Sequence, residues 1–180
     1  MKKTILSLFL ISLTTIVMAQ KMATTSAVIS FDATTAKDAL PKAENKTVIA
    51  SLDKTTGELK FEAAVNNFAF SNPMMQDHFN SDKWMNSAAF PKFTFSGKIT
   101  KLGEVKFNKN GSYDVKVSGD LTIKAVTKTI SVPAKIVVKD GVVTSSASFS
   151  VKLADYGISG QPVEAGKVAT EPKITVAATF

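Results

Sequence analysis

The chain has 180 residues, and its 22 basic residues, all of them lysine, outnumber 15 acidic residues, while cysteine is absent and histidine occurs once. The absence of cysteine excludes disulfide bonds and thiolate metal sites, and a single histidine cannot build a histidine-rich metal centre. Arginine is also absent and the lysines are scattered along the chain, so nucleic acid is not an expected partner.

Residues 1–19 have the pattern of a cleaved secretory signal peptide. Two lysines precede an apolar run at 5–17, and Ala19 ends the short segment before the predicted cleavage site. The apolar run is too short to anchor the protein across a bilayer. We therefore expect a periplasmic or secreted protein that is not integral to a membrane. It would have a polar tail at 20–26 and one domain at 27–180.

Apolar side chains recur at every second position through most of this domain, most regularly at 113–138, which predicts strands with one apolar and one polar face. Residues that tolerate a positive φ occur at 54–57, at 108–111 and in Asp140-Gly141, and they favour tight hairpin turns. Neighbouring strands are therefore expected to be antiparallel. The predicted strands are 27–33, 47–53, 58–70, 92–101, 112–124, 127–139, 142–153 and 173–180.

The third predicted strand changes phase. Leu59 and Phe61 share one face with Val65, but Phe68 and Phe70 follow in the opposite phase. A β-bulge at the two asparagines between Val65 and Phe68 would return all five side chains to one face.

A segment at 72–89 breaks the alternation and predicts one or two short helices. Asn72 is a suitable cap and Pro73 suits the first helical turn. Met74, Met75 and several large apolar residues follow. Such a segment would either plug one end of a barrel with ordinary core residues or cover a flexible apolar ligand.

The run at 119–128 reads Gly-Asp-Leu-Thr-Ile-Lys-Ala-Val-Thr-Lys. Other short motifs along the chain are Met75, His78-Phe79, Ser81, Phe90-Pro91, Phe95, Gly97 and Asp155-Tyr156-Gly157-Ile158. In their order these motifs resemble those of the YceI-like family of exported proteins. The run at 119–128 departs from the family signature at Ala125, where glycine is usual, and at Lys124, where histidine is common.

The resemblance implies an all-β fold: an eight-stranded antiparallel lipocalin-like β-barrel with the short helical insertion at about 72–89. It also implies a tunnel that binds a long apolar molecule, such as a polyisoprenoid, an isoprenoid quinone or a fatty amide, and it implies no catalysis. Independently of the resemblance, about eight strands close into a barrel just wide enough to be filled by side chains or to hold one ligand.

The expected function is that of an exported protein that sequesters or carries a long-chain lipid in the barrel tunnel, with no cofactor and no metal. The sequence leaves the oligomeric state open between a monomer and a dimer. The side chains expected to contact the ligand are Phe61, Val65, Phe68, Phe70, Met74, Met75, Phe79, Trp84, Phe93, Phe95, Val117, Leu121, Ile123 and Phe149.

No enzymatic activity is expected. His78 is the only imidazole in the chain and has no second histidine to work with. Asp155 and Tyr156 could serve as an acid and a proton donor, but the adjacent Gly157 favours a turn.

Two further alternatives stay open. The first is a small outer-membrane β-barrel, which would place many lysines in a narrow lumen and would need aromatic girdles that one tryptophan and two tyrosines cannot form. The second is an exported structural β-domain with a fully packed core.

Overall fold

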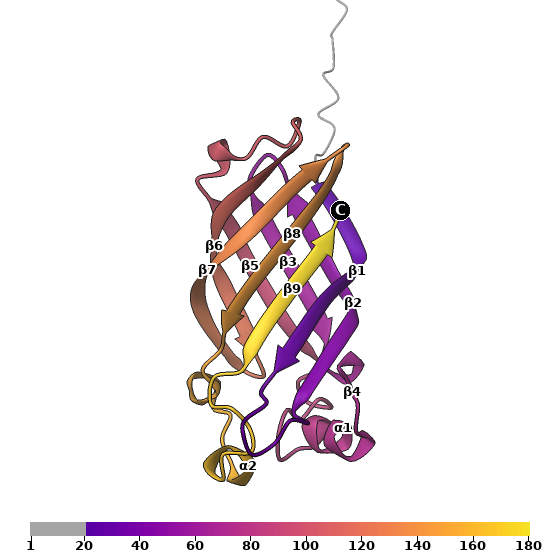
Figure 1. The fold of residues 1–180 in the computed structure, drawn as a ribbon, viewed down its shortest axis with the longest axis vertical. Helices are drawn as coiled ribbons and strands as arrows, with labels where there is room; N and C mark the ends of the chain where they lie inside the picture. The colour runs from indigo at the N-terminus through magenta and orange to yellow at the C-terminus, as the bar shows by residue number, and fades with distance from the viewer. Residues whose placement is uncertain (1–20) are drawn as a thin grey trace, which may run out of the picture.

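The computed structural model describes residues 21–180 and forms one closed barrel with short helices at one end (Figure 1). The helices are α1 (Pro73–Asn80) and α2 (Gln161–Glu164), with 3-10 turns η1 (Val65–Asn67), η2 (Leu102–Glu104) and η3 (Leu153–Tyr156). The strands are β1 (Lys21–Asp32), β2 (Lys42–Asp53), β3 (Glu58–Ala64), β4 (Ala69–Phe70), β5 (Lys92–Thr100), β6 (Gly111–Ile123), β7 (Val126–Lys139), β8 (Val142–Ser150) and β9 (Lys173–Thr179).

Eight of these strands close the barrel, as expected. The order is β1-β9-β8-β7-β6-β5-β3-β2, all neighbours are antiparallel, and β1 also pairs with β2 to complete the ring. The two-residue strand β4 pairs only with the start of β2. Each long strand therefore has a neighbour on both sides, and alternate side chains point into the barrel.

The predicted hairpin turns at 54–57 and 140–141 are confirmed, whereas 108–111 is only the end of a longer β5–β6 connection that includes η2. In the β7–β8 turn Asp140 has a φ of 50° and Gly141 a φ of 85°. This is the left-handed geometry that a two-residue hairpin favours. The β6–β7 turn is equally short, and here Lys124 has a φ of 55°, a conformation that is uncommon for a residue with a Cβ atom.

Strands β1 and β2 begin earlier than expected. Residues 21–26, expected to form a polar tail, are the first half of β1 and pair with the end of β2 from Lys21 opposite Asp53. Four of these six side chains are polar, but pairing uses main-chain groups, so polarity alone does not exclude a strand. The predicted signal peptide, 1–19, lies outside the described residues.

Strand β2 begins at Lys42, and irregular pairing with β1 surrounds its buried Asn45. The Asn45 amide donates to the Ala64 carbonyl at 2.9 Å and its side-chain oxygen accepts from the Thr47 main-chain N–H at 2.9 Å. The asparagine therefore satisfies the main-chain groups that the irregular pairing leaves free.

The predicted β-bulge in the third strand is wrong. Strand β3 ends at Ala64, and the 3-10 turn η1 takes the place of the bulge. The Val65 N–H donates to the Pro91 carbonyl at 2.9 Å, outside the sheet. The turn returns Phe68 to the barrel interior beside Leu59 and Phe61, but it does not bring all five side chains to one face.

Helix α1 begins at Pro73, and Asn72 caps it by accepting a hydrogen bond of 2.9 Å from the Met74 N–H, as predicted. The helix ends at Asn80, and turns rather than a second helix continue to the start of β5. The predicted strand at 142–153 is also too long, because β8 ends at Ser150 and η3 follows.

Two buried clusters divide the barrel interior along its length. One lies at the end away from α1 and α2, where Leu52, Ile136 and Val143 are almost fully buried. The other lies at the helical end and contains Phe68, Phe79 and residues of the loops. Between the two clusters the interior is lined but not filled.

Candidate functional site

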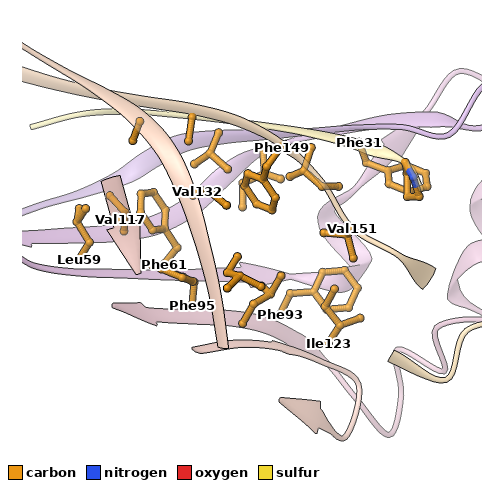
Figure 2. A pocket seen from close by; sticks show the side chains of 18 of the residues that line it. Phe31, Leu59, Phe61, Phe93, Phe95, Val117, Ile123, Val132, Phe149 and Val151 are labelled. Atoms are coloured by element: carbon orange, nitrogen blue, oxygen red, sulfur yellow. The ribbon is translucent and has the colours of Figure 1, made fainter. Parts of the chain in front are cut away.

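A cavity of about 150 Å³ lies inside the barrel. Figure 2 shows it as an elongated space: Leu59 and Val117 lie toward one end, Phe61, Phe95 and Phe149 surround the middle, and Phe31 lies at the other end. The Leu59 and Val117 end meets the packed cluster away from the helices. The Phe31 end points toward α1 and α2.

The wall of this inner cavity is almost entirely apolar because alternate residues of each strand face inward. On β6 these are Val117, Leu121 and Ile123, and on β8 they include Ala147 and Phe149. Among the described residues that line the cavity, none is charged, and the hydroxyl groups are those of two serines on β8. Such a surface offers contact area and almost no hydrogen bonding.

The middle of the barrel differs from an ordinary packed core. Phe61, Phe95, Leu121 and Phe149 face the interior, yet their side chains are only partly buried. Ile136, in the cluster at the closed end, is by contrast 0% exposed. A cavity of this size with aliphatic and aromatic walls stays dry and accepts an apolar guest.

Nine of the fourteen side chains expected to contact a ligand line the inner cavity. They come from β3, β5, β6, β8, α1 and the segment between η1 and β4, while β7 adds Ile130, Val132, Ala134 and Ile136 to the wall between β6 and β8. The nine are Phe61, Phe68, Phe79, Phe93, Phe95, Val117, Leu121, Ile123 and Phe149.

The other five lie elsewhere. Phe70, Met75 and Trp84 line a second cavity of about 190 Å³ beside α1, which we call the outer cavity. Val65 is fully buried and lines neither cavity, and Met74 is 76% exposed on α1. Neither residue therefore lines a cavity, since the short helix turns Met74 to solvent and the 3-10 turn directs Val65 into the packed core.

Several lining residues were not among the expected contacts. Ile29 and Phe31 on β1, and Ile174 and Val176 on β9, complete the wall where the barrel closes. Their alternation is visible in the sequence, so the pattern could have included them. Met85, Leu153 and Ile158 come from turns and loops, where no periodicity identifies an inward position.

Phe79 is the centre of an aromatic cluster between the two cavities. Its ring centroid lies 5.0 Å from that of Phe70, 6.0 Å from that of Phe68 and 6.2 Å from that of Phe31. Phe31 and Phe79 line both cavities. These two rings therefore form the partition between the inner and the outer cavity.

The chemically reactive residues singled out from the sequence are separated. His78 is exposed at the outer cavity, with its ring centroid 5.9 Å from that of Trp84. Tyr156 is 4% exposed in η3, and its hydroxyl has no hydrogen-bonding partner among the described residues. Burial raises the pKa of this hydroxyl above its ordinary value. Within 21–180 no three histidine, cysteine or acidic side chains converge as a metal site.

A closed ring of antiparallel strands around an apolar, partly empty interior defines the class of lipocalin-like β-barrels. The chain belongs to the YceI-like family, since the YceI-like domain matches residues 14–180. This confirms the resemblance that the 119–128 motif carries. No curated protein matches the sequence. Among the helices of 21–180, none has the length and apolar character needed to cross a membrane.

Solved structures share the fold. BcnA from Burkholderia cenocepacia is 19% identical with a TM-score of 0.69, over 86% of this chain and 96% of that chain. A polyisoprenoid binding domain from Saccharophagus degradans is 13% identical with a TM-score of 0.75, over 89% and 97%. The YCEI protein of Campylobacter jejuni is 20% identical with a TM-score of 0.54, over 74% and 80%. At these identities the likeness establishes the fold.

Proposed function

We propose that this protein is an exported, non-enzymatic carrier that holds a long-chain apolar lipid, a polyisoprenoid or an isoprenoid quinone, inside its barrel. The observation that carries the proposal is the unfilled inner cavity with its uncharged, almost wholly apolar wall. A water-soluble substrate would find no hydrogen-bonding partners there, whereas a hydrocarbon chain needs none.

Burial energetics support a chain-like ligand. Each CH₂ group moved from water into a dry cavity contributes about 0.8 kcal/mol, so a few isoprene units suffice for tight binding. The inner cavity of about 150 Å³ holds only part of such a chain. A ligand of several isoprene units would reach the outer cavity once the contacting rings of Phe31 and Phe79 move apart.

The Saccharophagus degradans domain supports the ligand class, because it has the same fold and is a polyisoprenoid binding domain. Because the sequence identity is low, the ligand assignment for this chain depends on the side chains that line its own inner cavity. The branched methyl groups of an isoprenoid suit a wall built from Val, Ile, Leu and Phe side chains.

The alternatives fit the geometry less well. An outer-membrane barrel needs apolar side chains outside, whereas here they face inward and Lys60, Lys98 and Lys116 are exposed outside. A purely structural domain would be expected to fill its interior to the density of an ordinary core. The separated positions of His78 and Tyr156 do not favour an enzyme.

The periplasmic or secreted location rests on the signal-like sequence at 1–19. Cell fractionation and N-terminal sequencing of the mature protein test it directly. We expect a chain that begins near Gln20 in the exported fraction. Recovery of the uncleaved chain, with its N-terminal apolar run, from the cytoplasmic fraction would contradict export.

The ligand is tested by native purification, organic extraction and mass spectrometry. We expect a near-stoichiometric polyisoprenoid or isoprenoid quinone. Recovery of fatty acid alone would overturn the isoprenoid assignment and keep the carrier function. Recovery of no lipid, together with failure of lipid-free protein to bind any apolar probe, would refute the carrier function.

A further inference from the structure

The barrel end that carries α1 and α2 is built from two groups of loops (Figure 1). One group, residues 33–41 and 151–172, contains the β1–β2 loop and α2, and we call it the rim. The other group, residues 72–90, contains α1, and we call it the lid. Across the described residues, 21–180, no hydrogen bond or ion pair joins the rim to the lid. The rim and the lid are therefore separate units of one barrel end.

The rim is bonded to itself and to the barrel. The Thr35 hydroxyl donates to the Gly166 carbonyl at 2.8 Å, and the Ala169 N–H donates to the Ala33 carbonyl at 2.8 Å. The rim segments continue directly into β1, β2, β8 and β9, which pair with one another around the ring. The rim is thus a fixed part of the barrel.

The lid is a compact unit of its own. Within it the Met85 N–H donates to the Phe79 carbonyl at 3.0 Å, and the Ser87 N–H donates to the Asn80 carbonyl at 3.1 Å. These bonds fold the turns after α1 back onto the end of the helix. A movement of the whole lid as one body therefore breaks none of them.

Few hydrogen bonds hold the lid to the barrel. Near its start the Phe70 N–H of β4 donates to the Gln76 side-chain oxygen at 3.4 Å, which is a long bond. Away from its two ends, the lid has one hydrogen bond to the rest of the chain that the structure describes. It runs from the Lys124 ammonium group to the Trp84 carbonyl at 2.9 Å.

The outer cavity lies between the lid and the rim. His78 and Trp84 line it from the lid, while Asp38 and Lys167 line it from the rim. The two surfaces thus enclose about 190 Å³ of space where a packed interface would have side-chain contacts. Segments with few contacts to the rest of a protein open locally at low free energy. This boundary is therefore where the barrel end opens most readily.

The lid also closes the inner cavity. Phe79 and Met85 are its two side chains in the inner-cavity wall, and both are buried. The Phe79 ring contacts the Phe31 ring of β1, with centroids 6.2 Å apart, so the two rings separate the inner cavity from the outer one. The opposite end of the barrel is filled by the packed cluster around Ile136. A guest molecule can therefore reach the inner cavity only after part of the wall moves.

We propose that residues 72–90 swing away from the rim as one body, hinged at Ser71 and Pro91, and that this movement withdraws Phe79 from Phe31 and opens the inner cavity. The hydrogen bond from Lys124 is the latch that favours the closed position. The inference rests on the proposed carrier function, for which the lid controls entry and exit of the ligand. Because opening breaks the latch in both the free and the loaded protein, the latch sets the rates of binding and release and leaves the affinity unchanged.

Lid opening is tested first without any ligand, through the reactivity of an introduced thiol. The chain has no cysteine, so Met85→Cys and Val143→Cys each provide a single thiol, one on the lid and one in the packed cluster at the opposite end. We expect dithiobis(nitrobenzoate) to modify the Met85→Cys protein about tenfold faster or more, because local opening is easier than global unfolding. Adding Lys124→Met should raise this rate further, as static exposure of the thiol would not. Equal rates for the two single variants would overturn the lid.

Control of ligand exchange is tested by stopped-flow binding and release of the apolar dye N-phenylnaphthylamine. Lys124→Met should raise both rates about five- to thirtyfold, the factor expected for one hydrogen bond from a charged donor, and change Kd by less than about twofold. Lys83→Met is the matched control, because Lys83 is exposed on the lid and lines neither cavity. It should leave both rates unchanged. A changed Kd with an unchanged association rate in Lys124→Met would overturn the latch.

A cross-link between the lid and the rim gives the opposite test. In the double variant His78→Cys with Lys167→Cys, the two thiols line the outer cavity from the lid and from the rim, and a short bis-maleimide joins them. The cross-linked protein should take up and release the dye more slowly by about tenfold or more than the same variant capped with N-ethylmaleimide. Unchanged exchange would overturn the lid as the gate. Failure of every variant to bind dye, with fast modification of the Met85→Cys thiol, would refute the carrier function while the lid movement stands.

Discussion

The ammonium group of Lys124 donates a hydrogen bond of 2.9 Å to the main-chain oxygen of Trp84 and also lies 5.9 Å from the centroid of the Phe90 ring. Lys124 is in the two-residue β6–β7 turn, where its φ is positive. The Lys124 side chain therefore connects the β6–β7 hairpin to the segment around Trp84, which lines the outer cavity. This contact gives a role to the lysine that replaces the histidine common in the family.

Replacing Lys124 by methionine should lower the free energy of unfolding by about 1–2 kcal/mol, because the variant keeps the apolar stem and loses a hydrogen bond from a charged donor. Urea unfolding measures the change. Lys128→Met is the control, since Lys128 is exposed on the same hairpin and should change stability by less than about 0.5 kcal/mol. Equal effects of the two substitutions would show that the Lys124–Trp84 hydrogen bond contributes nothing.

Gly119→Ala should destabilise the barrel by about 3 kcal/mol, near the upper end of the usual cost of overpacking. Gly119 pairs with Gly97 across β5 and β6, and a Cβ atom on Gly119 would lie 2.3 Å from the Gly97 Cα atom and 2.4 Å from the Ser96 carbonyl oxygen. Both obstacles are main chain, so the strands would have to separate.

Gly103→Ala is the matched control for this change, because a Cβ atom there would meet no atom within 4 Å. Chemical denaturation of the two variants should therefore give clearly different midpoints. A Gly119→Ala protein as stable as Gly103→Ala would mean that β5 and β6 are further apart than described.

Ala147→Leu distinguishes an empty cavity from a packed core. Ala147 faces the inner cavity on β8, so added methyl groups should fill space and raise the stability of lipid-free protein by about 1–2 kcal/mol. The same change should reduce the amount of lipid that co-purifies. In a packed interior it would cost about 1–3 kcal/mol instead. Ala177→Leu, at an exposed position on β9, controls for leucine itself.

Tyr156→Phe should leave stability at neutral pH unchanged or raise it, because the buried hydroxyl that it removes has no partner within the described part of the chain. In the wild type, burial raises the pKa of Tyr156 in the folded state. The folded protein therefore holds this proton more tightly than the unfolded chain, so the free energy of unfolding falls as pH rises above the ordinary tyrosine pKa.

Urea unfolding at pH 7 and at about pH 11 should show a smaller alkaline loss of stability for Tyr156→Phe than for the wild type. The other tyrosine, Tyr113, donates from its hydroxyl to main-chain oxygens and serves as the comparison in Tyr113→Phe. A loss of stability at neutral pH in Tyr156→Phe would indicate that a bound molecule satisfies the Tyr156 hydroxyl.

The alternation in the sequence was enough to predict the regular part of the barrel. Strand β7, predicted at 127–139, runs from Val126 to Lys139, and the inward positions of β5 and β6 follow directly from the pattern. The early starts of β1 and β2 were missed because polar side chains occupy both faces there. The pairing that forms them comes from main-chain hydrogen bonds with distant segments, which leave no local signal.

The candidate site was predictable to the same extent as the strands. Inward residues such as Phe95 and Leu121 were identified from their alternation. The outer cavity was not, because Asp38, Trp84 and Lys167 come from loops far apart in the sequence. Their meeting depends on barrel closure, which brings the β1–β2 loop next to the segment after α2.

The pairing of β1 with β9 has a consequence for folding. Most neighbouring strands are joined by nearby turns, but Val28 pairs with Ala177 across almost the whole chain. Contacts of such high sequence separation slow folding. A molecule that lacks β9 has two unpaired edges, on β1 and β8, which are ready templates for association with other chains. The slow step in folding should thus be the closure of the ring by β9. Chaperones that shield strand edges should increase the yield of folded protein most when they bind before this closure.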